Sequence, residues 1–401
     1  MNYLLEPLSN CCNISIIHMN TPLLEKNTRQ IGWIDFMRIV ACFTVVLAHC
    51  CDPFVGQGNN NYDAFLSGAF IGSLTRPCVP LFVMISGILL IPTGMGMTDF
   101  YKRRLKRVVI PLVIWSLILP FLYYAYFQLG ITTNNPNIVA ADHTLQATMS
   151  KLGSFIFNFQ YATIPLWYLY MLVGLYLFMP IIGSWLASAS KKDIRCFLGI
   201  WIVSMTLPYL QLIAPALGYT GNYGDMGLLG VCTWNPYGML YYFSGFLGYI
   251  VLAYYLKTYP LEWSWKKTLG VAIPLFVAGY AITIAGLLYI QQAFPGDTWK
   301  IELFWLFAGI NVFMMTLASF IVLQKLSIRQ SPLLSKLAAL TFGVYLCHFF
   351  FVQCGYDIIA KCLPGIPYAL QIPCIAIIAF AISLTLTWVL SKSRWTRKSV
   401  M

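Results

Sequence analysis

The chain has 401 residues, of which 59% are hydrophobic and only 9% are charged, and its formal net charge is +12. Because a soluble domain carries roughly 25% charged residues, this composition excludes a soluble protein and predicts an integral membrane protein that is mostly embedded. The twelve cysteines form no C-x-x-C or C-x-x-H pair, so the sequence predicts no metal site.

Residues 1–30 hold no apolar run that approaches the ~20 residues of a membrane span, and we predict a cytosolic extension of unknown function. A transmembrane domain over 31–392 and a basic cytosolic tail over 393–401 follow. Within that domain, long apolar runs predict an all-α polytopic helix bundle with ten transmembrane helices. The predicted helices cover 33–51, 69–92, 107–129, 160–186, 196–213, 236–256, 268–290, 301–324, 335–357 and 367–390.

The basic residues predict the orientation of this bundle. Twenty of the 25 lysines and arginines lie next to the two ends of the chain or in alternate connections between the predicted helices. The opposite connections hold only Lys151, Lys300 and Lys361. The positive-inside rule then predicts that both termini are cytosolic. Topology therefore accounts for the net charge of +12, and no nucleic-acid partner is expected.

The first predicted helix carries Asp35, Arg38 and His49 in an otherwise apolar run. Ionisable groups at membrane depth are costly, usually face the protein interior or a water-filled cavity, and mark function. Arg38 and His49 are eleven residues apart, so they share one helix face about 16 Å apart along the axis. Asp35 lies on nearly the same face. An isolated Arg38 that extends to the inner membrane interface is an equally good interpretation of that residue.

His49 needs a carboxylate close by if its imidazole is to be oriented as a base. Asp35 lies about 21 Å from it along the helix and is too far away. Asp52 is one turn on from His49, although Pro53 suggests that the helix ends there. Glu302, at the outer start of a later predicted helix, is another option.

Two further ionisable residues lie within predicted spans. Arg76 is in the outer third of the second helix, where Pro77 and Pro80 predict a kink. Its depth is similar to that of His49, so its guanidinium could stabilise negative charge that develops on a substrate during a reaction at His49. His348 lies near the middle of the ninth predicted helix, where an ordinary role in helix packing is the simpler interpretation.

A basic cluster at residues 102–107 precedes the predicted helix 107–129. Its simplest interpretation is that it marks the cytosolic side of the membrane. It could also bind phosphates, because the free N–H groups and the dipole at the start of a helix favour anions.

Taken together, six segments resemble the acyltransferase 3 family of membrane O-acyltransferases, from about residue 31 to residue 392. In the first segment an arginine is followed eleven residues later by a histidine, and the third contains Arg-x-x-Arg as Arg104 and Arg107. Within the family, the likeness is to enzymes that acetylate surface glycans such as the enterobacterial common antigen. In chain order, the segments are IGWIDFMRIVACFTVVLAH, RPCVPLFVMISGIL, FYKRRLKRVVIPLVIW, IPLWYLYMLVGLYLFMPII, YYFSGFLGY and LTFGVYLCHFF.

The resemblance implies transfer of an acyl group, usually acetyl, from cytosolic acyl-CoA to a hydroxyl of a glycan or glycolipid, in the bacterial inner membrane. Acyl-CoA, most simply acetyl-CoA, is then a co-substrate, and no bound cofactor is expected. The resemblance also implies that His49 is catalytic and that Arg38, Arg104 and Arg107 handle the CoA side. Asp35 is placed with them because it shares the polar face of the first helix.

These assignments predict a mechanism and a cavity. His49 acts as the base and Arg76 stabilises negative charge, while Ser86 is only a remote candidate for an acyl carrier. Trp167, His348 and Glu302 are further possible site residues. Because CoA is cytosolic and His49 lies toward the outer half, a cavity should follow the polar face of the first helix.

The main alternative is a transporter, proton-coupled or specific for a polysaccharide, that uses the same polar residues as its path. Oligomeric state is left open. The outer connections 130–159 and 214–235, rich in Gly, Asn, Thr and Tyr, suit contacts with a sugar-bearing acceptor, although ordinary solvated loops are the simpler interpretation.

Overall fold

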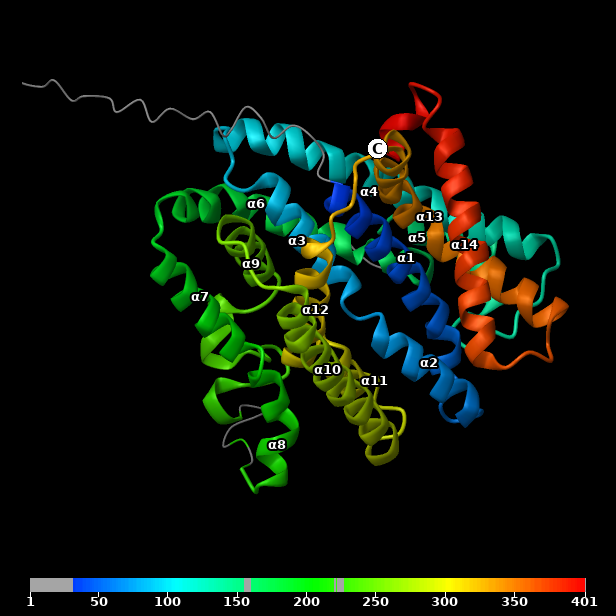
Figure 1. Cartoon of the computed structure of the whole chain (residues 1–401). Helices are drawn as coiled ribbons and strands as arrows, with labels where there is room; N and C mark the ends of the chain where they lie inside the picture. The colour runs from blue at the N-terminus through cyan, green and yellow to red at the C-terminus, as the bar shows by residue number, and fades with distance from the viewer. Residues whose placement is uncertain (1–31, 155–159, 220, 222–226, 401) are drawn as a thin grey trace, which may run out of the picture.

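The computed structural model describes residues 32–154, 160–219, 221 and 227–400, and every regular element in these ranges is a helix. The helices pack into one bundle (Figure 1). The elements that form its long segments are α1 (Gly32–Val55), α2 (Tyr62–Leu74) with α3 (Cys78–Leu90), α4 (Met97–Gln128), the 3₁₀ turn η2 (Tyr161–Leu166) with α6 (Trp167–Ser188), α7 (Lys191–Ser204) with α8 (Leu210–Ala216), α10 (Trp265–Ala293), α11 (Thr298–Trp305) with α12 (Ile310–Lys325), α13 (Pro332–Cys362) and α14 (Tyr368–Leu390).

Nine segments in the described ranges are long and apolar enough to cross a membrane, and they correspond to nine of the ten predicted helices. The predicted polytopic helical bundle is therefore confirmed. The tenth prediction, 236–256, differs. It contains the 3₁₀ turn η5 (Gly238–Phe243) and the 12-residue helix α9 (Leu247–Thr258), separated near Gly245, whose φ of +78° is not helical. A hydropathy average depends only on residue types, so it detects the apolar run but not a break in the helical backbone.

Although α9 is short, it returns the chain to the end of the bundle from which α7 departs. The Lys191 ammonium at the start of α7 lies 4.6 Å from the centre of the Tyr259 ring, just after α9. Near the end of α9, Lys257 Nζ donates a 2.7 Å hydrogen bond to the carbonyl of Ile88, at the end of α3. The chain from α7 to α9 thus runs out and back, as the predicted topology requires.

The second predicted span is divided into α2 and α3, and Arg76 lies in the break between them. Pro77 lacks a backbone N–H and disfavours helical backbone at the residue before it, so α2 ends at Leu74 and α3 begins at Cys78. Pro80 lies in the first turn of α3, where its missing N–H costs no helical bond. Of the two predicted kink positions, only Pro77 interrupts the helix.

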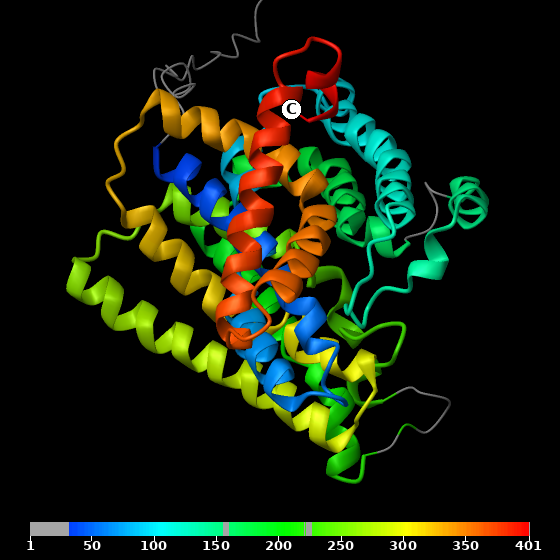
Figure 2. The same ribbon diagram turned by 90° about the vertical axis from the view of Figure 1, so that its right-hand side faces the viewer.

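Helix α1 is the central helix for function, because its polar face is enclosed by protein. It packs against α2, α3, α13 and α14, and the last two cover one side of it (Figure 2). Asp35 is only 1% exposed, and Met37 and Ala41 on the same helix are fully buried. Asp35, near the start of this helix, therefore points into the bundle.

Helices α10 and α12 form a second tightly packed pair. A Cβ atom on Gly279 of α10 would lie 2.5 Å from the carbonyl oxygen of Asn311 in α12, so only glycine fits there. The Asn311 side chain donates a 2.8 Å hydrogen bond to Thr283 Oγ1 on α10. Close backbone approach and a buried polar bond hold this pair together.

The last residues fold back onto the bundle. Trp115 Nε1 in α4 donates a 2.9 Å hydrogen bond to the carbonyl of Ser399, and Val400 is fully buried. The segment 393–400, predicted as a basic tail, is thus anchored to α4. The predicted extension 1–30 lies outside the described residues.

Candidate active site

The centre of the candidate site is a hydrogen-bonded pair on α1. His49 Nδ1 lies 2.7 Å from Asp52 Oδ2. The helix does not end at Pro53 but continues to Val55, so Asp52 stands one turn from His49 on the same face. Because a carboxylate only accepts, Nδ1 carries the proton in this arrangement and Nε2 keeps its lone pair. This is the geometry of an oriented general base.

Two residues of α13 pack against the His49 ring. The ring centre of His348 lies 5.3 Å from that of His49, and the ring centre of Phe349 lies 5.2 Å from it. His348 Nδ1 donates to the carbonyl of Tyr345 at 2.6 Å, which leaves the buried Nε2 of His348 without a partner. His348 therefore packs against the base and holds an unused acceptor beside it.

A cavity of about 570 Å³ runs beside α1 from His49 to a basic end. Three guanidinium side chains, Arg38, Arg104 and Arg107, line it together with His49. The remaining lining is mostly apolar and aromatic, including Tyr168 of α6. The cavity that the first helix predicts is therefore present.

The basic end of this cavity contains a buried hydrogen-bond donor that has no partner. Arg104 Nε is buried and has no hydrogen-bond partner. Tyr176, from α6, lines the cavity together with Arg38, Arg104 and Arg107. The sequence placed the basic cluster at a helix start near residue 107, whereas α4 begins at Met97. The two arginines lie beyond its first turn, so side chains and not free backbone N–H groups form this basic end.

Asp35 stands behind this cavity. Its Oδ1 lies 3.6 Å from Arg38 Nη1, and its Oδ2 accepts a 3.0 Å hydrogen bond from Ser335 of α13. The carboxylate does not line the cavity. Its side-chain contacts are with Arg38 and Ser335, so it links Arg38 to α13 and holds the position of that guanidinium.

The structure does not bring Arg76 to His49. The guanidinium carbon of Arg76 lies 4.3 Å from the centre of the Trp305 ring and 5.1 Å from that of Phe307. Arg76 Nε donates a 3.3 Å hydrogen bond to the carbonyl of Gly72 on α2. Its side chain therefore packs on Trp305 and Phe307 and not on His49.

The remaining candidates divide between the cavity and the Arg76 cluster. Trp167 lines the cavity and stacks on Phe307, with ring centres 5.7 Å apart. Ser86 also lines the cavity, and its hydroxyl donates to the carbonyl of Phe82 at 3.2 Å. Glu302, on α11, lies near Arg76 and makes no ion pair or hydrogen bond with His49 among the described residues.

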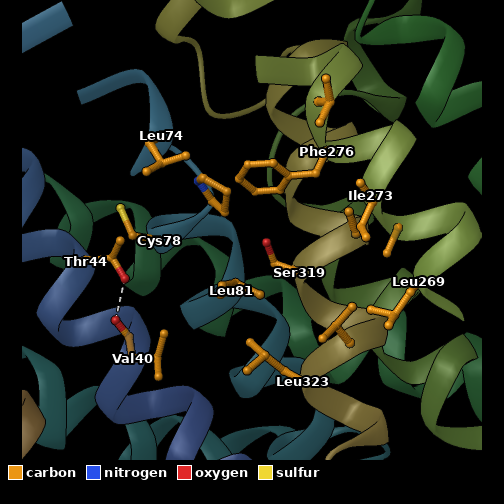
Figure 3. A pocket seen from close by; sticks show the side chains of 15 residues that line it. Val40, Thr44, Leu74, Cys78, Leu81, Leu269, Ile273, Phe276, Ser319 and Leu323 are labelled. Atoms are coloured by element: carbon orange, nitrogen blue, oxygen red, sulfur yellow. Dashed lines mark hydrogen bonds between the residues drawn. The ribbon is translucent and has the colours of Figure 1, made fainter. Parts of the chain in front are cut away.

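A second cavity of about 500 Å³ lies between α1, α3, α10 and α12 (Figure 3). Its lining is almost entirely apolar. The hydroxyls of Thr44 and Ser319 are bonded to the backbone carbonyls of Val40 and Met315. The lining of this cavity holds no acidic, basic or histidine side chain, so the cavity beside His49 is the candidate site.

The chain matches the family model described as an acyltransferase domain over residues 31–391, most of its length. The protein belongs to the acyltransferase 3 family. It is a multi-pass membrane acyltransferase. No curated protein and no solved structure matches the chain.

Some contacts of this acyltransferase are not visible in the sequence. Asp52 was one of two possible partners for His49, and its i, i+3 spacing was the signal for it. Tyr176 and Tyr345 offered no signal, because aromatic residues are frequent in every apolar segment. Their positions at the cavity depend on how α6 and α13 pack against α1.

Proposed function

We propose that the acyltransferase moves an acetyl group from cytosolic acetyl-CoA to a hydroxyl of a cell-surface polysaccharide, O-antigen or lipid-linked glycan, in the bacterial inner membrane. The observation that carries this proposal is one cavity with guanidinium groups at one end and an oriented histidine at the other. Membership of the acyltransferase family favours transfer over the alternative of transport.

The basic end suits the phosphates of CoA. Arg104 and Arg107 carry planar guanidinium groups that bind phosphate oxygens through paired hydrogen bonds, which a lysine cannot reproduce. The buried, unpartnered Nε of Arg104 is a donor that such a ligand satisfies. Arg38, held by Asp35, lines the same cavity as these arginines and His49. The apolar walls beyond them suit the uncharged pantetheine arm and place the thioester next to the imidazole.

The chemistry needs one base and one leaving thiol. The acceptor hydroxyl attacks the thioester carbonyl carbon while His49 Nε2 takes its proton. A C–O bond forms, the C–S bond breaks, and the imidazolium returns the proton to the CoA sulfur. Asp52 holds the ring in the required tautomer and stabilises the imidazolium. No acyl-enzyme is required, and Ser86, whose hydroxyl is bonded to a backbone carbonyl, is not used.

Arg76 takes a positioning role in this mechanism. Its guanidinium packs on Phe307, and Phe307 stacks on Trp167, which lines the cavity. Loss of the cation would loosen that stack and move the cavity wall. Direct contact with the reacting atoms is not part of the proposal.

Transfer of radiolabelled acetyl groups tests the function. The purified protein is incubated with acetyl-CoA and with surface-glycan extract from a strain that lacks the gene. We expect label in the glycan, loss of transfer in His49→Ala by about 10²- to 10⁴-fold, and near-normal transfer in Lys102→Gln, an exposed residue outside the cavity. A protein that binds no CoA, together with a His49→Ala variant that still acetylates cell glycans, would falsify the proposal.

A further inference from the structure

A second polar cavity lies on the other side of the His49–Asp52 pair. Its volume is about 340 Å³, within the range of about 300–1,000 Å³ that is usual for small-molecule sites. Four elements enclose it: α4, the connection that ends in the 3₁₀ turn η1 (Ala140–His143), the helix α5 (Leu145–Leu152), and η2. We call it the outer cavity, because the connection 130–154 follows the end of α4 opposite its basic cluster.

The outer cavity and the CoA cavity share one wall. Tyr161 and Ala162 at the start of η2 line the outer cavity, whereas Pro165 at its end and the adjacent Trp167 line the CoA cavity. The Tyr345 hydroxyl donates to the carbonyl of Pro165 and ties this wall to α13. A single 3₁₀ turn therefore separates the two cavities.

The His49–Asp52 pair has contacts on the sides of both the CoA cavity and the outer cavity. His49 lines the CoA cavity. Asn137 lines the outer cavity, and its side-chain amide donates a 2.8 Å hydrogen bond to the backbone carbonyl of Asp52. From the same side, Tyr161 packs on Phe349 at 5.3 Å between ring centres, and Phe349 contacts His49 at 5.2 Å. The outer cavity is thus linked to Asp52 through Asn137, and to His49 through Tyr161 and Phe349.

The lining of the outer cavity suits a carbohydrate. It offers hydroxyl and amide side chains from Thr148, Ser154 and Gln160, which match the hydroxyls of a sugar. One carboxylate, Asp142, and one ammonium, Lys151, leave the lining without a net charge. Such a lining favours neither a polyanion nor a lipid tail.

Two aromatic rings complete this lining. Tyr161 and His143 line the cavity, and the His143 ring is itself stacked on Tyr123 and on Phe127, each with ring centres 5.3 Å apart. Burial lowers the pKa of His143 to about 4, so this residue adds no positive charge near neutral pH. Hydrogen-bonding groups beside uncharged rings are the combination that a saccharide requires.

We propose that the outer cavity is the acceptor subsite, which binds a saccharide unit and directs one hydroxyl to His49 Nε2; this inference rests on the proposed function. Donor and acceptor then enter from opposite sides of the membrane and meet at the His49–Asp52 pair. The acceptor does not need to pass through the CoA cavity. Specificity for the glycan resides in the connection 137–143, α5 and η2.

Variants that block the outer cavity should reduce acetylation of the glycan without changing the binding or hydrolysis of acetyl-CoA. Val139 lines the cavity and is 58% exposed, so Val139→Trp places a large ring at its mouth without repacking a core. Leu145→Trp is the matched control, because Leu145 is 51% exposed on α5 and does not line the cavity. Asp142→Ala, which removes a polar group from the lining, is the second test variant.

Each variant is expressed in the deletion strain, and acetate released from the surface glycan by base is measured. The purified variants are assayed for acetyl-CoA affinity and for acetyl-CoA hydrolysis in the absence of glycan. We expect Val139→Trp and Asp142→Ala to lower glycan acetylation at least tenfold, with unchanged acetyl-CoA affinity and hydrolysis, while Leu145→Trp matches the wild type. The proposal is overturned if both test variants acetylate the glycan normally, or if they lose acetyl-CoA binding along with transfer. If the wild-type protein itself uses no acetyl-CoA, the proposed function has failed instead.

Discussion

The bond between His49 and Asp52 makes a quantitative prediction. Asp52→Asn keeps the size and one acceptor oxygen but removes the negative charge that faces the imidazole at 2.7 Å. A hydrogen bond to a charged group contributes about 1.5–3 kcal/mol. The Asp52 side chain is 37% exposed, so solvent screening places the effect at the lower end. A loss of about 1.5 kcal/mol in the transition state corresponds to a roughly tenfold lower kcat.

The assay is the initial rate of acetyl transfer to glycan extract at saturating acetyl-CoA, with KM for acetyl-CoA measured alongside. The reasoning requires kcat to fall while that KM stays constant, because Asp52 does not line the CoA cavity. Asp63→Asn, at a carboxylate on α2 that has no contact with His49, is the control. An Asp52→Asn variant with full kcat, or one with a raised KM for acetyl-CoA and an unchanged kcat, would refute the assignment.

Three further predictions concern the CoA end, the packing and the pH response. Arg104→Gln should raise KM for acetyl-CoA about tenfold or more with little change in kcat, because a charged bond to phosphate is lost; equal effects in Lys102→Gln would contradict a specific site. Gly279→Ala should lower stability by about 1–3 kcal/mol in thermal unfolding, since the new Cβ meets a backbone oxygen of α12 at 2.5 Å. Gly270→Ala on the same helix meets no atom within 4 Å and should be neutral or stabilising; similar losses in both would show that overpacking is not the cause. The pKa of His143, about 4 in the folded protein and ordinarily 6.5, means that the unfolded chain binds the proton first as pH falls. Stability should therefore decline between pH 6.5 and pH 4, and His143→Phe should flatten that part of a plot of Tm against pH; an unaltered slope would exclude this origin.

Much of the fold follows from local properties of the sequence. Apolar runs and the alternation of basic residues predicted nine of the long segments and the course of the chain. The eleven-residue spacing of Arg38 and His49 predicted that one cavity would reach both, and it does. These features depend on helix periodicity and on the cost of charge in a membrane, which act on each segment independently.

Features that depend on backbone breaks or on tertiary packing were harder to predict. A hydropathy pattern does not register the positive φ of Gly245, so 236–256 was expected to be one continuous helix. Pro53 suggested a helix end that the packing around α1 overrides. The rings that Arg76 packs against depend on the break before α3 and on Trp305, a residue of a distant segment.

The central claim is that CoA occupies the cavity beside α1 with its thioester at His49. An experimental structure of the His49→Ala variant with acetyl-CoA bound tests this most directly. The account predicts phosphates against Arg104 and Arg107 and the thioester carbon next to the position of the missing imidazole. Acetyl-CoA bound with its thioester at the basic end, or bound outside this cavity, would contradict the account.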